Sequence, residues 1–332
     1  MTAFRPRPTG RRARIAVLDD YMGVAHRLAD WSLLEDRAEV TFLTHAIPPE
    51  RLTTDLAPFD AICLLRERTD FPAEVLHGLP DLKAIAATGK RNRTLDSDTA
   101  AALGIAVMGT ESSGNGVFAT VELAWGLIIG LLRHIPAEAA AMRDGLWQTR
   151  LGGALYGRTL GLVGFGRLGH RMAQVAQAFG MQVVAWSPNL TPQRARDGGA
   201  VLVDKETLFG TADVVSLHLV LGPTTHGIVG AGDLARMKPE AILVNTARGP
   251  LVDTDALLEA LAVGRIAGAG IDVYDHEPLA AGHPLRTAPG TLLTPHLGYC
   301  VRETFEAFYR DCVDNLDGWL DGAPRRLLAP DT

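Results

Sequence analysis

The sequence predicts an α/β protein that contains two doubly wound sheets of parallel strands. Short apolar and β-branched runs alternate with longer, Ala-rich stretches of helical period. This pattern is typical of strands that are buried on both faces and joined by crossover helices. The runs form two series, and a long segment over residues 110–156 separates them. A chain of 332 residues is long enough to form two domains with separate cores.

The candidate strands are the apolar runs themselves. The first series comprises 14–20, 38–43, 61–65 and 82–88, and the second comprises 160–165, 182–186, 214–220, 241–246, 267–273 and 291–295. Between the two series, a glycine-containing loop over 111–116 leads into a helix-like run over 117–133 that is expected to bridge two lobes. The most apolar part of that run, 123–132, is far shorter than the ~18 to 20 residues that cross a bilayer. We therefore expect a buried helix and no membrane partner.

Composition narrows the class of partner. The net charge of -6 gives no reason to expect a nucleic acid, because proteins that bind polyanions usually carry a dominant basic face. Residues 1–12 are basic but no apolar signal sequence follows them, so we expect a disordered lead-in and a cytoplasmic protein. Cys63, Cys300 and Cys312 are spaced neither as a disulfide framework nor as zinc ligands, and no metal site is expected. The expected partner is a small molecule.

A glycine-rich turn in the second series predicts dinucleotide binding. Gly164, Gly166 and Gly169 follow an apolar strand as G-x-G-x-x-G and precede a helix-period stretch that ends at Gly180. The first glycine allows a tight turn, the second leaves room for a pyrophosphate and the third lets helix and strand approach closely. The helix N-terminus then offers N–H groups and a positive dipole to phosphate. Packing alone also explains three glycines near a turn, but the strand, turn and helix context favours nucleotide binding.

The end of the next strand bears on the choice between NAD and NADP. An Asp or Glu there would bond both ribose hydroxyls and repel a 2′-phosphate. This chain has Ser187, which bonds the ribose weakly and repels nothing. Arg194 or Arg196 could hold a 2′-phosphate if either side chain folded back toward this edge; alternatively, both lie in solvent on a surface helix that begins near Thr191. NAD is the expected cofactor, and NADP stays open.

Three later motifs place chemically active side chains after strands of the same sheet. Arg248 lies in VNTARGPLVD, Asp272 and Glu277 lie in GIDVYDHEPL, and His296 lies in TPHLGY. Ligands of open α/β sheets bind at the carboxyl ends of the strands, so these residues can converge on one cleft. Each also has a structural explanation: a surface ion pair for Arg248 and Glu277, a strand-end cap for Asp272 and a packed core position for His296. The three motifs together favour a catalytic site.

With these motifs in this order, the chain from about residue 14 to 328 resembles the D-isomer-specific 2-hydroxyacid dehydrogenases. The glycine fingerprint, NTARGPLVD, DVYDHEPL and TPHLGY carry the resemblance. It implies a Rossmann-type cofactor domain over 110–299 that is inserted into a flavodoxin-like substrate domain, which comprises 13–109 and is completed by 300–330. It also implies hydride transfer between NAD(P)H and C2 of a small 2-keto acid.

The resemblance assigns roles to the polar residues of the second series. His296 would be the general acid and base, and Glu277 would be a neighbouring carboxylate that favours its protonated form. Arg248 would hold the substrate carboxylate with its planar fork and polarise the carbonyl. Asp272 would lie beside the nicotinamide amide. The implied cofactor contacts are Gly164, Gly166, Arg167, Leu168, Gly169, Ser187, His218, Thr246, Ala247, Arg248, Asp272, His296 and Gly298, although a histidine such as His218 is also common as a hydrogen-bonded strand end.

The first series departs from the family where the substrate should bind. Relatives usually carry a Gly-Val-Gly loop whose backbone N–H groups meet the substrate carboxylate, whereas this chain has Thr88, Gly89, Lys90 and Arg91. Together with the arginine and histidine above, these four residues form the predicted substrate site. Lys90, Arg91 and Arg93 could bind a second anionic group of the substrate, or they could point to solvent.

Two further departures concern the same lobe and the helix that follows it. The family's Glu-His pair is Glu122 and Leu123 here, which puts in doubt any role taken over from that histidine. Residues 19–21, Asp-Asp-Tyr, could line the mouth of a cleft, but capping of a helix by an aspartate explains them as well.

The leading hypothesis is a D-2-hydroxyacid dehydrogenase that acts as a homodimer. The resemblance implies the dimer, and the segment over 136–156 is the candidate arm because it is too long for a simple connector. The competing hypothesis is a non-catalytic protein on the same fold that senses nicotinamide nucleotides and docks a partner. The intact catalytic motifs argue against it, since a sensor does not need all three.

Overall fold

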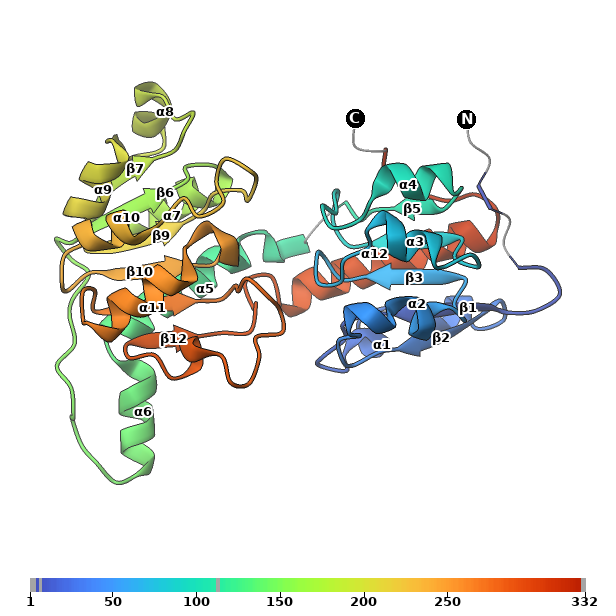
Figure 1. The fold of residues 1–332 in the computed structure, drawn as a ribbon, viewed down its shortest axis with the longest axis horizontal. Helices are drawn as coiled ribbons and strands as arrows, with labels where there is room; N and C mark the ends of the chain where they lie inside the picture. The colour runs from blue at the N-terminus through green and yellow to red at the C-terminus, as the bar shows by residue number, and fades with distance from the viewer. Residues whose placement is uncertain (1–3, 6–7, 112–113, 330–332) are drawn as a thin grey trace. The chain divides into compact units, whose positions relative to one another are not determined.

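The computed structural model describes residues 4–5, 8–111 and 114–329, and it forms two compact units (Figure 1). Unit 1 comprises residues 1–117 and 301–332, and unit 2 comprises residues 118–300. Unit 2 is therefore an insertion in unit 1. Each unit has its own sheet, in which every strand pair is parallel. The predicted fold class, two parallel α/β sheets, is confirmed.

Unit 1 is built on a five-stranded sheet of order β2-β1-β3-β4-β5, which is the flavodoxin-like order. Its strands are β1 (Ala13–Val17), β2 (Ala38–Phe42), β3 (Ala61–Leu64), β4 (Ala84–Ala87) and β5 (Ala106–Met108). The residues of β3 and β4 are all buried, as expected for strands covered on both faces. The sequence pattern missed β5, because three residues carry too little periodicity.

Helices and a shared apolar core cover the sheet of unit 1. The helices are α1 (Ala25–Leu28), η1 (Trp31–Leu34), η2 (Pro49–Arg51), α2 (Leu52–Leu56), α3 (Ala73–His77), α4 (Ser97–Ala102) and α12 (Arg302–Leu320). One core cluster contains Ile62, Ile85 and Phe71. The long helix α12 packs against β4, so the chain that returns from unit 2 completes the core of unit 1.

The N-terminal residues, which the sequence analysis expects to be disordered, are described only in part. Residues 1–3 and 6–7 lie outside the described residues. Arg11 donates two hydrogen bonds, of 2.7 and 2.9 Å, to the buried carboxylate of Asp60. Arg5 donates to the carbonyl oxygens of Pro80 and Leu82.

Unit 2 contains a seven-stranded sheet of order β12-β11-β10-β9-β6-β7-β8. Its strands are β6 (Thr159–Val163), β7 (Gln182–Trp186), β8 (Val201–Leu202), β9 (Val214–Leu217), β10 (Ile242–Asn245), β11 (Gly268–Ile271) and β12 (Thr291–Leu293). The order runs outward in both directions from β6 and β9, as in doubly wound dinucleotide-binding sheets. The chain therefore reverses direction across the sheet between these two strands, and a crevice is expected at their carboxyl ends.

Helices lie on both faces of this sheet (Figure 1). They are α5 (Ala119–Leu132), α6 (Ile135–Arg143), α7 (Arg167–Ala178), α8 (Pro192–Asp197), α9 (Lys205–Thr211), α10 (Ala231–Arg236) and α11 (Thr254–Ala262), with short turns η3 (Gly114–Phe118), η4 (Gly249–Leu251) and η5 (Pro284–Arg286). Strand side chains alternate between the faces: Leu162 packs in the core with α5 and α7, and Val163 packs in the core with α9, α10 and α11.

The apolar helix α5 is a core helix, as predicted. Its residues Ala124, Leu127 and Ile128 are at most 2% exposed. Among the described helices, none is by itself long and apolar enough to span a membrane; the stretches Gly116–Leu132 and Ile135–Arg143 reach that length and composition only together, across a 62° bend.

Candidate active site

The three glycines after β6 shape an open turn at the start of α7. Gly164 has φ +101, and a Cβ built there would lie 2.6 Å from the carbonyl carbon of His218. A Cβ on Gly169 would lie 2.6 Å from the carbonyl oxygen of Gly164, so the helix packs directly on the turn. By contrast, a Cβ on Gly166 would meet no heavy atom within 4 Å. The turn therefore leaves space in front of the N-terminus of α7, where no side chain caps the helix, and this arrangement fits a pyrophosphate.

The neighbouring strand ends add polar atoms along the same carboxyl edge. Thr246, after β10, is buried, and its hydroxyl has no hydrogen-bond partner among the described residues. A buried hydroxyl without a partner is costly in a finished structure, so this atom fits contact with a bound polar ligand. The ring of His218, after β9, lies 2.9 Å from the hydroxyl of Ser216. Burial lowers the pKa of His218 to about 4, so its ring is neutral near pH 7.

The ribose edge lies after β7. Ser187 is half-buried, and its carbonyl accepts a hydrogen bond from the N–H of Leu190. Arg194 folds back along this turn and donates to the carbonyl oxygen of Asn189 at 3.3 Å. Arg196 donates instead to the side chain of Gln193 within its own helix, at 3.0 Å. Of the two arginines considered from the sequence, Arg194 is therefore the one that reaches the turn after β7.

His296 and Glu277 form a close polar pair at this edge of the sheet. The Nδ1 atom of His296 lies 2.6 Å from Oε2 of Glu277, and the two side chains are 22% and 24% exposed. The other carboxylate oxygen, Oε1, accepts a hydrogen bond of 2.9 Å from the backbone N–H of Tyr274. Both oxygens of Glu277 are thus oriented, and the imidazole bonds through Nδ1. This leaves Nε2 as the ring nitrogen that can exchange a proton with a ligand.

The loop that carries His296 is held by the buried carboxylate of Asp272. This carboxylate accepts hydrogen bonds from the hydroxyl of Thr294 (2.6 Å) and from the N–H groups of Leu297 (2.7 Å) and Gly298 (2.9 Å). Burial raises the pKa of Asp272, while these bonds and the nearby His296 act in the opposite direction. His296 itself has φ +54, which is unusual for a residue with a side chain. The Asp272 network stabilises that backbone conformation.

Arg248 lies in the next loop of the same edge. It is half-buried, and its guanidinium donates to the carbonyl oxygen of Ala247 at 2.7 Å. The side chain of Asn245 bonds both the N–H of Ala247 (3.0 Å) and the carbonyl of Arg248 (2.8 Å), so the loop has a defined path. A Cβ on Gly249 would lie 2.1 Å from the carbonyl carbon of Tyr274. The loops after β10 and β11 are consequently in direct backbone contact.

Most of the predicted site residues in unit 2 lie along one edge of the sheet. The strands that precede them are neighbours in the order β12-β11-β10-β9-β6, with β7 beyond β6, and parallel strands end at the same edge. Arg167 is exposed in the first turn of α7, whereas Leu168 packs partly into the core. Among the described residues, no cluster of three or more His, Cys, Asp or Glu side chains could hold a metal ion.

Four predicted substrate residues belong to unit 1, after β4. Thr88 is fully buried, and its hydroxyl accepts a hydrogen bond from the N–H of Arg66 at 2.8 Å. The N–H of Gly89 donates to the hydroxyl of Thr110 at 2.7 Å. Lys90 and Arg91 are exposed. The first two residues therefore fix the loop, and the last two present charge to solvent.

Several residues that shape these loops escaped the sequence analysis. Tyr274 donates through its hydroxyl to the carbonyl oxygen of Thr294 at 2.9 Å, and burial raises the pKa of Tyr274 to about 12. Asn245 and Arg66 were missed as well. The only available signal was position, because each lies within a few residues of a predicted strand end.

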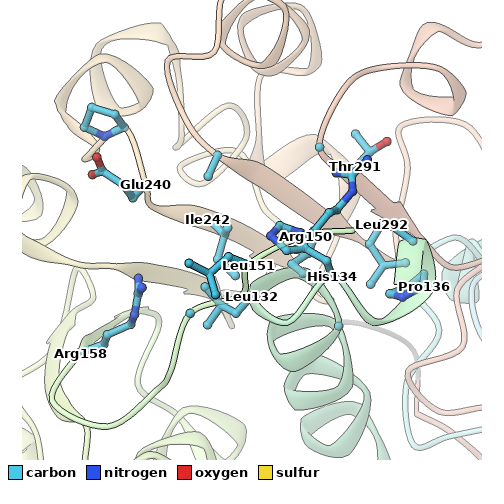
Figure 2. A pocket seen from close by; sticks show the side chains of 17 residues that line it. Leu132, His134, Pro136, Arg150, Leu151, Arg158, Glu240, Ile242, Thr291 and Leu292 are labelled. Atoms are coloured by element: carbon cyan, nitrogen blue, oxygen red, sulfur yellow. The ribbon is translucent and has the colours of Figure 1, made fainter. Parts of the chain in front are cut away.

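A separate cavity of about 620 Å³ lies at the opposite edge of the same sheet (Figure 2). Its lining includes Ile242 and Thr291, the first residues of β10 and β12, together with His134 and Arg150 from the segment around α6. Since the strands are parallel, this is the amino edge, and the cavity is not part of the glycine-turn site.

These features define a dinucleotide-binding α/β protein with a histidine–glutamate pair at the carboxyl edge of its sheet. Comparison with known proteins identifies the family of this chain. The NAD binding domain of the D-isomer specific 2-hydroxyacid dehydrogenases matches residues 125–298. The glyoxylate reductase of Thermococcus litoralis is 37% identical over 280 residues, which cover 81% of this chain and 83% of that protein. The chain belongs to the D-isomer-specific 2-hydroxyacid dehydrogenase family of NAD(P)-dependent oxidoreductases, so the predicted resemblance is confirmed.

Two further relatives agree in fold and differ in length. A crystal structure of a phosphoglycerate oxidoreductase from Vibrio cholerae superposes on this chain with a TM-score of 0.86 at 36% sequence identity. The superposition covers 94% of this chain and 100% of the Vibrio chain. The D-3-phosphoglycerate dehydrogenase of Mycobacterium tuberculosis is 35% identical over 297 residues, which are 88% of this chain and 55% of that protein. This chain thus spans about half the length of that curated relative.

Proposed function

We propose that the chain reduces a small 2-keto acid to the D-2-hydroxy acid, and catalyses the reverse oxidation, with His296, Glu277 and Arg248 as its catalytic residues. The observation that carries the proposal is the 2.6 Å pair of His296 and Glu277 on the sheet edge that also bears the glycine turn. Unit 2 binds the nicotinamide dinucleotide. A bound nicotinamide dinucleotide supplies the hydride that adds to C2.

His296 transfers the proton of this reaction. Its Nδ1 atom bonds to Glu277, whose negative charge stabilises the imidazolium form of the ring. The Nε2 atom then gives its proton to the C2 oxygen as the hydride adds to C2, and it takes the proton back in the oxidation. Because Glu277 is fixed by the N–H of Tyr274, the ring keeps one orientation between the two steps.

Arg248 binds the carboxylate of the substrate. A guanidinium presents two parallel N–H donors that match the two oxygens of a carboxylate. The half-buried position of Arg248 strengthens this interaction relative to one in open solvent. The same charge polarises the adjacent carbonyl, which favours hydride addition at C2.

The cofactor site follows the carboxyl edge of unit 2. Gly164, Gly166, Gly169 and the first residues of α7 bind the pyrophosphate, Ser187 the ribose, and the ends of β9 to β12 the nicotinamide side. The residues proposed for that side are His218, Thr246, Ala247, Asp272 and Gly298. NAD is the preferred cofactor. Discrimination against NADP is weak, because Ser187 does not repel a 2′-phosphate and Arg194 bonds to the same turn.

We also propose that the protein is a homodimer that pairs through the segment over 136–156. Figure 1 shows α6 and the following chain extending away from the sheet of unit 2. Apolar side chains on this segment are exposed, including Trp147 (75%), Leu151 (97%) and Tyr156 (82%). Large apolar side chains in such numbers usually mark a protein interface. Sedimentation of the wild type against Trp147→Ser tests this, with exposed Val263→Ser as control; a wild-type monomer contradicts it.

The catalytic proposal is tested by following NADH or NADPH oxidation with glyoxylate, hydroxypyruvate, pyruvate and 2-ketoglutarate. His296→Asn is expected to lower kcat by at least ~100-fold, the low end of acid-base contributions, with little change in nucleotide affinity. His276→Asn is the matched control, since His276 is exposed in the loop next to Glu277. No turnover by folded, nucleotide-binding protein would contradict an enzymatic role, and near-normal turnover of His296→Asn would remove His296 from the mechanism.

A further inference from the structure

Tyr274 is in contact with the loops of all three proposed catalytic residues. It follows β11 and lies three positions before Glu277 in the same loop. The loop after β10, which carries Arg248, touches the backbone of Tyr274, because a Cβ on Gly249 would lie 2.1 Å from the carbonyl carbon of Tyr274. The third loop follows β12 and carries His296, and the hydroxyl of Tyr274 bonds to it. All of these residues belong to unit 2.

The hydroxyl of Tyr274 bonds to the backbone just before His296. It lies 2.9 Å from the carbonyl oxygen of Thr294 and 3.1 Å from the carbonyl oxygen of Ile271. A phenol has one proton to donate, and the shorter distance favours Thr294 as the acceptor. The same carbonyl oxygen of Thr294 accepts the backbone N–H of His296 at 3.1 Å. The phenol and the backbone of His296 are therefore joined through one oxygen atom.

These contacts complete a closed circuit of hydrogen bonds around the histidine–glutamate pair. The backbone N–H of Tyr274 bonds to Oε1 of Glu277 at 2.9 Å, and Oε2 of Glu277 lies 2.6 Å from Nδ1 of His296. The carbonyl of Thr294 then connects the backbone of His296 to the hydroxyl of Tyr274. Tyr274 thus holds Glu277 through its main chain and the loop of His296 through its side chain. Loss of the hydroxyl would open the circuit at one bond and leave the other bonds in place.

The surroundings of Tyr274 keep its hydroxyl protonated. Burial raises the pKa of Tyr274 to about 12, and the charges of Asp272 and Glu277 act in the same direction, whereas the charge of Arg286 acts against them. The phenol is therefore an uncharged donor near neutral pH. Its ring packs against the apolar core that contains Leu285. A phenylalanine would keep this packing and lose only the donor.

We propose that Tyr274 is a positioning residue for proton transfer, and that its hydroxyl holds the loop of His296 where Nδ1 meets Glu277. This inference rests on the proposed function and adds a residue that acts through the histidine–glutamate pair. His296 has φ +54, so its backbone conformation depends on surrounding bonds of this kind. A bond that fixes the orientation of a proton donor contributes to the rate of the chemical step more than to the binding of ligands.

Tyr274→Phe tests the inference, because it removes the hydroxyl and keeps the ring. Rates are measured with NADH and the one of glyoxylate, hydroxypyruvate, pyruvate and 2-ketoglutarate that the wild type reduces fastest. We expect kcat to fall about 3- to 10-fold, the range for the loss of one hydrogen bond between uncharged groups. The KM for the 2-keto acid and the Kd for NADH should stay within ~2-fold of the wild type, because the variant changes the chemical step.

Thr291→Val is the matched control. The hydroxyl of Thr291, the first residue of β12, donates to the carbonyl oxygen of Ala288 at 2.9 Å. This variant also loses one bond between a hydroxyl and a backbone carbonyl, but at the amino edge of the sheet. Unfolding in urea measures the stability of both variants. We expect both to be folded and only Tyr274→Phe to lose kcat; equal losses of kcat in the two variants overturn the inference, because lost stability would then explain them.

A double-mutant cycle with Glu277→Gln shows whether Tyr274 acts through the pair. If it does, removing both groups lowers kcat by less than the product of the two separate losses. We expect Tyr274→Phe to lower kcat by less than ~2-fold in the Glu277→Gln protein. A loss in that protein as large as the loss in the wild type overturns the inference, because Tyr274 would then act independently of Glu277.

The outcomes separate this inference from the proposed function. Wild-type kcat in Tyr274→Phe overturns the inference and leaves the dehydrogenase and its histidine–glutamate pair in place. Near-normal turnover of His296→Asn removes the proton transfer that Tyr274 is proposed to assist, and it overturns the inference together with the proposed mechanism. Failure of all four acids with nucleotide-binding wild-type protein overturns the proposed function and the inference with it.

Discussion

Replacing Glu277 by glutamine tests whether the carboxylate beside His296 contributes to proton transfer. In the structure both oxygens of Glu277 accept hydrogen bonds: Oε1 from the N–H of Tyr274 at 2.9 Å and Oε2 from Nδ1 of His296 at 2.6 Å. A glutamine has the same shape but only one acceptor oxygen. Its NH₂ group must face one of the two donors, so the variant loses one bond and the negative charge together.

The expected decrease in kcat of Glu277→Gln follows from that geometry. A hydrogen bond to a charged group contributes about 1.5–3 kcal/mol. His296 and Glu277 are 22% and 24% exposed, so solvent screens the pair in part and the lower part of this range applies. At ~1.4 kcal/mol for each factor of ten, kcat for reduction should fall by at least ~10-fold. The affinity for NADH should change little, because the glycine turn is untouched.

Steady-state rates at saturating 2-keto acid give kcat, and quenching of protein fluorescence by NADH gives its Kd. Asp275→Asn is the matched control, since Asp275 is an exposed acid of the same loop that accepts a hydrogen bond from Thr254 at 2.7 Å. That variant should keep wild-type kcat. If Glu277→Gln turns over within ~2-fold of the wild type, the charge of Glu277 plays no part in the chemical step.

Three further changes probe the cofactor turn and the stability of unit 1. Ser187→Asp should move the kcat/KM ratio roughly 10-fold toward NADH, because the new carboxylate repels a 2′-phosphate; an unchanged ratio means that position 187 does not contact the ribose. Gly164→Ala should lower the free energy of unfolding by more than about 2 kcal/mol, because φ is +101 at this position and the new Cβ would meet the backbone of His218. Gly166→Ala should unfold in denaturant like the wild type, because its Cβ meets no atom, but it should bind NADH more weakly. Burial raises the pKa of Asp60, but the hydrogen bonds to its carboxylate outweigh burial, so the pKa is lowered overall. Asp60→Asn should therefore lower the free energy of unfolding near pH 7, and its difference from the wild type should shrink as the pH falls through that lowered pKa. A difference in the free energy of unfolding that does not change with pH would contradict this.

The sheet-edge positions of the glycine turn and of the proposed catalytic residues were predictable because each one depends on local chemistry. Gly164 needs a positive φ and has no room for a Cβ, so its type is dictated by the turn itself. Arg248 and His296 follow buried strands, and any residue there lies at the carboxyl edge of the sheet. The network behind them was not predictable. Asp272 bonds to Thr294 across 22 positions of the chain, and only the pairing of β11 with β12 brings the two together.

The loop after β4, which is predicted to bind substrate, shows the same division more sharply. Its charge is visible in the sequence, but charge alone is compatible with a solvated surface. The bonds that fix it join Arg66 to Thr88 and Asn92, across 22 and 26 positions. Arg66 has φ +55, a backbone conformation that arginine rarely adopts. No periodicity or turn signal predicts such a residue there. Strain of this kind persists only where surrounding contacts stabilise it, and in many proteins such sites bind ligands. The strained backbone of Arg66 belongs to the loop after β3, and only the pairing of β3 with β4 brings it to the loop after β4.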